Sequence, residues 1–190
     1  MGREFELKYR ATSEAITAIR EKYGPFTRIT METAYYDTPD HALSDLRWTL
    51  RRRYENGRSV CTVKVPLADG SRGEWETECD TIQEAIPELC KLGAPQHLEI
   101  LTEYGVMRTC AARFTRLAAP IFLEGAEIEL ALDEGCLLGG SKELPFAEVE
   151  VELKYGSEAA ATAFAQTLEK EYGLVPEPKS KVQRALELTK

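Results

Sequence analysis

Residues 4–10 read EFELKYR, with a charged side chain at every second position. Alternation with period two is typical of a β-strand, because successive side chains of a strand point to opposite faces of the sheet. One face of this strand is therefore apolar or aromatic, and the other carries the charged residues Glu4, Glu6, Lys8 and Arg10. The start of the chain thus predicts a sheet with one strongly charged face.

Similar segments continue along the chain and are separated by turn residues, of which Asn56-Gly57 is a strong hairpin signal. Strands are expected at residues 4–10, 31–36, 48–54, 59–66, 72–79, 114–123, 127–133 and 146–155. Helices are expected at residues 13–22, 81–93 and 96–112, between Ser157 and Gly173, and, as a short helix or strand, at 180–188. Strands joined as hairpins, with helices in blocks, favour an α+β fold with an antiparallel sheet. Eight such strands are enough to close a barrel.

The charged faces of these strands are nearly pure and are segregated by sign. Arg51, Arg53 and Lys64 give basic faces, whereas the last two strands present mainly carboxylates. A solvated sheet face is the simplest explanation for any one strand. Across the set, carboxylates on neighbouring strands would repel one another unless a cation lay among them. Mg²⁺ and Mn²⁺ prefer such oxygen ligands, and arginine forks match the oxygens of phosphate.

An inward charged face would make a polar tunnel, and its apolar outside could be covered by helices. The segment 159–168, with Ala161, Phe164 and Leu168 on one side, is a candidate cover. A tunnel with carboxylates on one side and basic groups on the other suits phosphoryl transfer, in which catalysis is mainly positioning and charge stabilisation.

Composition narrows the function classes. The chain has 190 residues and a net charge of -8, which fits one domain and argues against bulk nucleic-acid binding. Five cysteines without a C-x-x-C motif and two isolated histidines argue against a zinc site, a disulfide framework and histidine or cysteine catalysis. No apolar run approaches the ~20 residues that cross a bilayer, and no signal peptide is recognisable. We therefore expect a cytoplasmic protein, monomeric or homodimeric, that binds no membrane.

Residues 4–8 resemble the E-x-E-x-K signature of the CYTH superfamily, the triphosphate tunnel metalloenzymes. Further motifs follow in the family's order over essentially the whole chain: Tyr36-Asp37-Thr38, Leu50-Arg51-Arg52-Arg53, Thr62-Val63-Lys64, Arg72-Gly73-Glu74, Ile128-Glu129-Leu130-Ala131-Leu132-Asp133, Glu148-Val149-Glu150-Val151-Glu152, and Ser180-Lys181 with Arg184. Arg52 departs from the family, which often has an apolar residue there, and its parity points it outward.

The resemblance implies a single domain over residues 1–190, a closed eight-stranded antiparallel barrel with a charged interior, outer helices, and bound Mg²⁺ or Mn²⁺. The implied metal ligands are Glu4, Glu6, Glu74, Asp133, Glu150 and Glu152, with Glu74 and Asp133 at a second metal or at the attacking water. The implied phosphate ligands are Lys8, Arg51, Arg53, Lys64, Arg116, Lys181 and Arg184, with Arg113 as the alternative to Arg116. The implied catalytic set is Glu4, Glu6, Lys8, Glu74 and Asp133. Glu76, Glu129 and Glu148 face inward by parity and are expected to act only as electrostatic background.

The motifs most resemble those of bacterial inorganic triphosphatases, so hydrolysis of tripolyphosphate to pyrophosphate and phosphate is the leading hypothesis. Adenylate cyclase, thiamine triphosphatase and nucleoside triphosphatase activities occur on the same fold and remain alternatives. Trp48 and Trp75 could stack an organic ring, although their positions favour packing under helices. A polyphosphate-binding module without turnover is the rival from another class, and the many carboxylates weigh against it.

Overall fold

The computed structural model describes residues 5–68 and 72–190. Its described part forms one antiparallel sheet in the order β5-β4-β3-β2-β6-β7-β8-β1-β9. The strands are β1 Glu6–Arg10, β2 Thr27–Asp37, β3 Thr49–Glu55, β4 Arg58–Pro66, β5 Arg72–Glu78, β6 Met107–Leu123, β7 Ala126–Gly139, β8 Lys142–Gly156 and β9 Val175–Pro176. The helices are α1 Ser13–Tyr23, α2 Ala42–Asp45, α3 Ile82–Lys91, α4 His97–Leu101, α5 Glu158–Tyr172 and α6 Lys181–Glu187.

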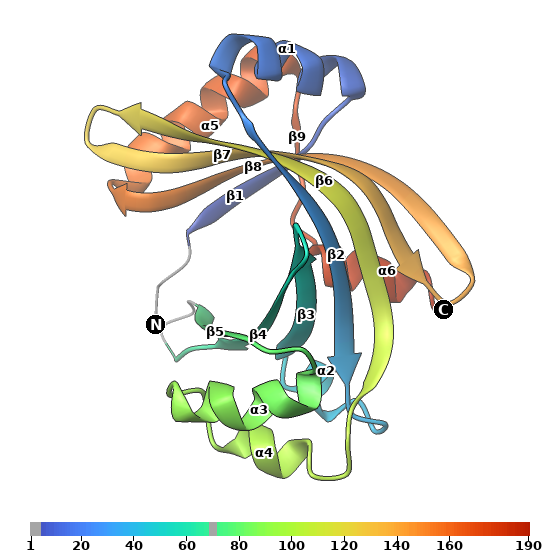
Figure 1. Cartoon of the computed structure of the whole chain (residues 1–190). Coiled ribbons are helices and arrows are strands. Elements are labelled where there is room, and N and C mark those ends of the chain that lie inside the picture. The colour runs from blue at the N-terminus through green and yellow to red at the C-terminus, as the bar shows by residue number, and fades with distance from the viewer. Residues whose placement is uncertain (1–4, 69–71) are drawn as a thin grey trace.

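The sheet curls strongly around a central space, with α1 and α5 above it and α3 and α4 below it in Figure 1. The expected α+β fold with a tunnel-like antiparallel sheet is confirmed. Closure into a complete ring is not seen, because β5 and β9 end the hydrogen-bonded order in the described part of the chain. The edge of β1 that a closed ring would use pairs instead with β9, through Tyr9 and Arg10. β9 is two residues long, too short for a periodic pattern to predict.

Helices cover the outer face of the sheet, where the apolar side chains of the alternating strands point. In α5, Ala161, Ala165 and Leu168 follow helical spacing, and all three are fully buried against β1, β7 and β8. On the opposite side, Trp75 and Val63 pack in a second core with the apolar face of α3. Trp75 therefore packs under a helix, as its position suggests.

Helix α6 is an exception to the expected outer helices. Its residues Val182, Ala185 and Leu186 pack against Met31 and Phe114 in a third apolar cluster. Because Met31 and Phe114 line the central cavity, α6 lies on the inner face of the sheet, within the curl in Figure 1. The short closing segment is thus a helix and part of the cavity wall.

Residues 96–112 do not form the single helix that we expected. Helix α4 ends at Leu101, Gly105 adopts a φ of +92°, and strand β6 already begins at Met107. Pairing of β6 with both β2 and β7 outweighs the local helical preference of this segment. The Asn56-Gly57 turn does join β3 to β4, with φ values of 50° and 88°. Among the described residues, no helix is both long and apolar enough to span a membrane.

Candidate active site in the cavity of the sheet

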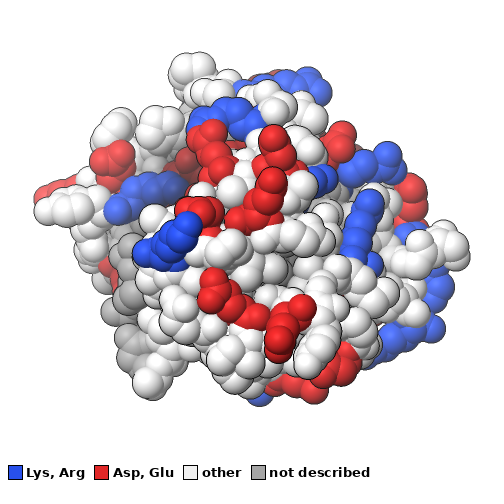
Figure 2. Space-filling view, turned by 60° about the horizontal axis from the view of Figure 1, so that its bottom comes forward, with Lys and Arg blue, Asp and Glu red and all other residues white. Residues whose placement is uncertain are grey.

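The curled sheet encloses a cavity of about 730 Å³, whose walls carry charges of both signs from seven strands and from helix α6. Its charged lining residues are Glu6, Lys8, Arg51, Arg53, Glu55, Lys64, Arg72, Glu74, Glu76, Arg116, Glu129, Glu150, Glu152, Lys154 and Lys181. On the outer face shown in Figure 2, acidic and basic side chains are interspersed.

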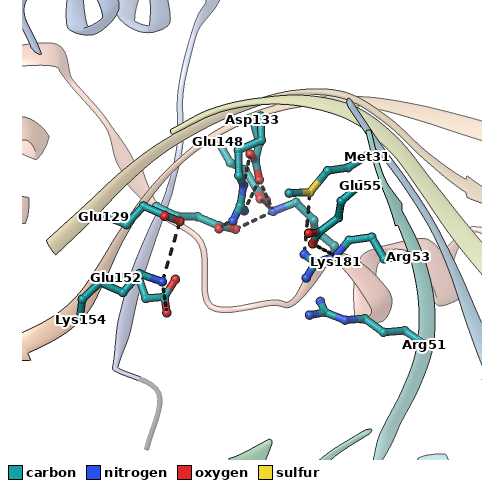
Figure 3. A network of polar contacts seen from close by, with 12 residues as sticks. Met31, Arg51, Arg53, Glu55, Glu129, Asp133, Glu148, Glu152, Lys154 and Lys181 are labelled. Carbon is teal, nitrogen blue, oxygen red and sulfur yellow. Dashed lines mark hydrogen bonds and ion pairs between the residues drawn. The ribbon is translucent and has the colours of Figure 1, made fainter. Parts of the chain in front are cut away.

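One wall of the cavity is acidic because strand register places glutamates side by side. Glu6 of β1 is paired with Glu152 of β8, and Glu152 is paired with Glu129 of β7. Directly opposed residues on neighbouring strands lie about 4.5–5.5 Å apart, and like charges at this spacing are destabilising. We call Glu6, Glu152 and Glu129 the carboxylate row. Lys154 reaches this row, and Figure 3 shows its contacts with Glu152 and Glu129.

The opposite wall comes from β3, β4 and β5 and carries four basic side chains together with Glu55, Glu74 and Glu76. We define the basic wall as Arg51, Arg53, Lys64 and Arg72, all of which line the cavity. Glu74 lies between two of them, 3.5 Å from Arg51 Nη2 and 3.3 Å from Lys64 Nζ. Burial, followed by repulsion from Arg51, lowers the pKa of Arg53 to about 10. Glu55 lies 2.7 Å from Arg53 Nε and partly offsets these effects, and the cations gathered on this wall favour a bound anion.

Unused hydrogen-bond donors support the same conclusion about the basic wall. The Nε atoms of Arg51 and Arg72 are buried and have no hydrogen-bond acceptor among the described residues. A buried donor without a partner costs about 1–3 kcal/mol. Phosphate oxygens entering the cavity would supply acceptors, so this wall is suited to a phosphate chain.

Between the two walls lies a buried ion cluster of three carboxylates and three cations. The carboxylates are Asp133, Glu148 and Glu150, and the cations are Arg116, Lys181 and Arg184. Lys181 Nζ lies 2.9 Å from Asp133, 2.5 Å from Glu148 and 2.6 Å from Glu150. Figure 3 shows Lys181 meeting carboxylates of β7 and β8. The cluster is formally neutral, which allows it to be buried.

The cluster shifts the pKa values of Glu150 and Lys181 in the expected directions. Burial favours the neutral acid of Glu150, but Lys181 and then Arg116 outweigh burial and hold its pKa well below the ordinary value. For Lys181, burial favours the neutral amine, but Glu150 and Asp133 raise its pKa well above the ordinary value. Arg116 donates two hydrogen bonds of 2.8 Å to Asp133 and also contacts Glu150.

Comparison with protein families shows which family has this architecture. The model of the CYTH domain matches residues 2–186. The chain belongs to the CYTH family. An inorganic triphosphatase from Haemophilus influenzae is 26% identical over 191 residues, which cover 97% of this chain and 54% of that protein. The chain therefore spans about half the length of the curated relative that it matches.

Several solved structures share the fold of this CYTH chain. A Hippeastrum protein, described as a candidate adenylyl cyclase with a dominant triphosphatase activity, aligns with a TM-score of 0.67 at 20% identity, over 100% of this chain and 97% of its own. A candidate adenylate cyclase from Bacillus halodurans has a TM-score of 0.63 at 21% identity, covering 97% and 98%. A Pyrococcus horikoshii protein has a TM-score of 0.63 at 24% identity, covering 97% and 99%. At these identities the likeness shows the fold.

The residues that the CYTH resemblance assigned to metal, phosphate or catalysis line the cavity with three exceptions. Asp133 and Arg184 do not line it and lie behind its wall, where Arg184 contacts Glu148 and Glu177. Glu4 lies outside the described residues. The remaining residues that the sequence implicated all line the cavity: Glu6, Lys8, Arg51, Arg53, Lys64, Glu74, Arg116, Glu150, Glu152 and Lys181.

The structure also separates neighbouring arginines of the CYTH chain. Arg116 lines the cavity, whereas Arg113 forms a half-exposed pair with Glu143 at 3.3 Å. Arg52 does not line the cavity and donates to the carbonyl of Asp80. Its outward position agrees with strand parity.

The sequence did not reveal the role of some residues of the site. Glu148 was expected to be electrostatic background, yet it is completely buried and bridges Lys181 and Arg184. Lys154 follows Glu150 and Glu152 as a second E-x-E-x-K motif, a signal that could have singled it out. Tyr35 also lines the cavity, beside Arg51 and Lys181, and no charge pattern marks it.

The acidic residues differ in their suitability for the divalent metal that the CYTH family implies. Carboxylate oxygens of Asp133, Glu148 and Glu150 lie within 4.8 Å of one another, but Lys181 already contacts all three, and Arg116 and Arg184 complete the charge balance. The carboxylate row faces the cavity, and its Glu152 is joined on the same face of β8 by Glu150. Its all-oxygen donors fit a hard cation such as Mg²⁺ or Mn²⁺.

Proposed function

We propose that the chain is a metal-dependent hydrolase that splits inorganic triphosphate into pyrophosphate and phosphate. The observation that carries the proposal is the single cavity with a carboxylate row on one wall and the basic wall opposite. The Haemophilus influenzae relative bears the name of this activity, and the Hippeastrum protein is described by triphosphatase activity. Neither comparison identifies the substrate of this chain.

Glu6, Glu150 and Glu152 would hold the metal ion. When bound, Mg²⁺ or Mn²⁺ supplies a Lewis acid that neutralises phosphate charge. Glu6 and Glu152 reach the cavity from paired strands, so their carboxylates approach the same region. The position of Glu4 in the motif makes it a further proposed ligand, although it lies outside the described residues.

The basic wall would bind the phosphate chain and stabilise the charge that develops during cleavage. Arg51 and Arg72 bring unused Nε donors, and Arg53 brings a charge that is costly to bury. Lys8 and Arg116 reach the cavity from other strands and would contact phosphates nearer the metal.

Water would attack the terminal phosphorus, and Glu74 is the proposed residue that orients it. The Glu74 carboxylate faces the cavity between Arg51 and Lys64. A new P–O bond would form as the anhydride P–O bond breaks, leaving pyrophosphate and inorganic phosphate. The other candidate for this role, Asp133, is fully buried and held by Arg116, so it would position Arg116 instead.

A substrate panel tests this function. The purified chain is incubated with tripolyphosphate, ATP or thiamine triphosphate in Mg²⁺, Mn²⁺ or EDTA, and phosphate, pyrophosphate and cyclic AMP are quantified. We expect phosphate and pyrophosphate from tripolyphosphate, with activity lost in EDTA. Cyclic AMP as the main product would support the cyclase alternative, and preferential cleavage of an organic triphosphate would support the corresponding hydrolase. Tripolyphosphate binding without any product would show a binding module.

A further inference from the structure

The lysine at the end of the second E-x-E-x-K motif enters the carboxylate row. Lys154 Nζ lies 2.8 Å from Glu152 Oε1 and 4.0 Å from Glu129 Oε1. Figure 3 shows all three side chains directed toward one another on the acidic side of the cavity. Lys154 also lines the cavity, so its ammonium group meets the same space as the carboxylates.

Strand register explains why Lys154 is next to the row. Lys8 is paired with Glu150, and Glu6 with Glu152, so Lys8 lies on one side of the Glu6–Glu152 pair. Lys154 follows Glu152 by two residues on the same face of β8 and lies on the other side of this pair. The Glu6–Glu152 pair is thus flanked by an ammonium group on each side along the strands.

The two lysines that contact acidic groups at this wall differ in how firmly they are held. Lys181 has three carboxylate partners within 2.9 Å, and its side chain is 10% exposed. Lys154 has one close partner, Glu152, and its side chain is 41% exposed. An ammonium group held by one partly exposed ion pair can leave the row at little cost.

We propose that Lys154 is a built-in competitor of the divalent metal at the carboxylate row. The ammonium group and a metal ion need the same carboxylate oxygen of Glu152, so each weakens the binding of the other. In the metal-free protein Lys154 relieves repulsion within the row, and metal binding displaces it toward the cavity. This inference rests on the proposed function only in assuming that the row binds metal.

The competition predicts that removing the charge of Lys154 tightens metal binding. A unit charge a few ångströms from a divalent ion opposes its binding even in water-like surroundings, and we expect Lys154→Met to raise Mn²⁺ affinity about tenfold. The measurement is Mn²⁺ binding to the substrate-free protein, by calorimetry or by electron paramagnetic resonance of free Mn²⁺. Lys154→Arg keeps the charge and should bind Mn²⁺ nearly as the wild type does.

Lys170→Met is the matched control, because Lys170 is exposed on α5, outside the sheet, and its replacement makes the same change in net charge. It should leave Mn²⁺ affinity within about twofold of the wild type, because exposed charges farther apart than about 10 Å are largely screened at 0.1 M salt. Adding Glu152→Gln to Lys154→Met should abolish the gain, which places the effect at the row. Lys154→Gln serves as a second charge-removing variant if the methionine variant does not fold.

Equal or weaker Mn²⁺ binding by the folded charge-free variants overturns the competitor role, and so does an equal gain in Lys170→Met. Absence of Mn²⁺ binding from every variant also overturns it. Failure of the proposed function looks different: wild-type protein would bind Mn²⁺ and show the Lys154 effect while releasing no product from any triphosphate.

Discussion

At the scale of single residues, strand parity separates arginines that are adjacent in sequence. Arg51 and Arg53 reach the cavity, whereas Arg52, between them, donates outside it to the carbonyl of Asp80. Arginine therefore has two roles in β3: it lines the cavity at positions 51 and 53, and it forms an outer hydrogen bond at position 52. Burial and Arg51 both lower the pKa of Arg53, although Glu55 lies beside it.

Replacing Arg53 should weaken substrate binding. A hydrogen bond to a charged group contributes about 1.5–3 kcal/mol, so Arg53→Met should raise the KM or Kd for Mg-tripolyphosphate about 10- to 100-fold. Steady-state kinetics or calorimetry provides the measurement. Arg52→Met removes the same charge from the outer face of the same strand and should change affinity less than threefold. Equal losses from both variants would refute a specific phosphate role for Arg53.

Arg184 is expected to matter for stability rather than for direct phosphate binding. It contacts Glu148, whose side chain is fully buried, and it does not line the cavity. Removing one partner of a buried ion pair costs about 3–5 kcal/mol, so Arg184→Met should lower the free energy of unfolding by that amount. Urea unfolding measures the change. Arg113→Met disrupts the half-exposed pair with Glu143 and should cost less than about 1 kcal/mol. A stable Arg184→Met protein would contradict the anchoring role.

At the scale of elements, the short helix α6 links the fold to the site. The Ser180 side chain accepts a hydrogen bond from the Gln183 backbone in a capping box, and Lys181 is the first residue of the helix. The apolar side of α6 packs on the inner face of β2 and β6. Capping and packing together fix the position of Lys181 among its carboxylates.

Loss of this cap should therefore disturb both stability and the site. Ser180→Ala should cost about 1 kcal/mol of unfolding free energy and should also raise the KM for tripolyphosphate. Ser157→Ala removes the cap of α5, on the outer face, and should cost a similar free energy without changing KM. Denaturant unfolding and initial-rate kinetics on both variants make the comparison. If Ser180→Ala leaves KM unchanged, α6 does not position the substrate.

At the scale of the whole molecule, a neutral ion cluster supports the centre of the curled sheet and makes stability depend on pH. The folded protein holds the pKa of Glu150 below its ordinary value, despite burial, through Lys181 and Arg116. Below that ordinary value the unfolded chain binds a proton that the folded protein does not. The free energy of unfolding should therefore fall as pH drops below about 4.5, the ordinary pKa of glutamate.

Glu150→Gln should reduce the dependence of the unfolding free energy on pH below about 4.5, because the amide cannot titrate. The same change lowers stability at neutral pH. Urea unfolding at a series of pH values from 6 to 3 measures the slope. Glu143→Gln changes an exposed carboxylate and should leave the slope as in the wild type. An unchanged slope in Glu150→Gln would show that other groups control acid unfolding.

Local pattern was sufficient to assign side chains to faces. Alternation in β1, β3, β4 and β8 correctly grouped Glu6 with Lys8, and Arg51 with Arg53, toward one side of the sheet. This succeeds because the period of a strand is a property of the backbone and does not depend on distant residues. Hairpin turns are equally local, which is why the Asn56-Gly57 turn between β3 and β4 was predicted correctly.

Contacts between segments that are distant in the sequence could be identified only from the tertiary structure. Sequence does not state that β9 occupies the free edge of β1, that α6 packs inside the curl, or that Lys181 lies among three carboxylates. It likewise does not distinguish a carboxylate already neutralised, such as Asp133, from one facing the cavity, such as Glu152. The physical reason is that charge balance and burial depend on which strands meet in space, whereas alternation along one strand reports only its two faces.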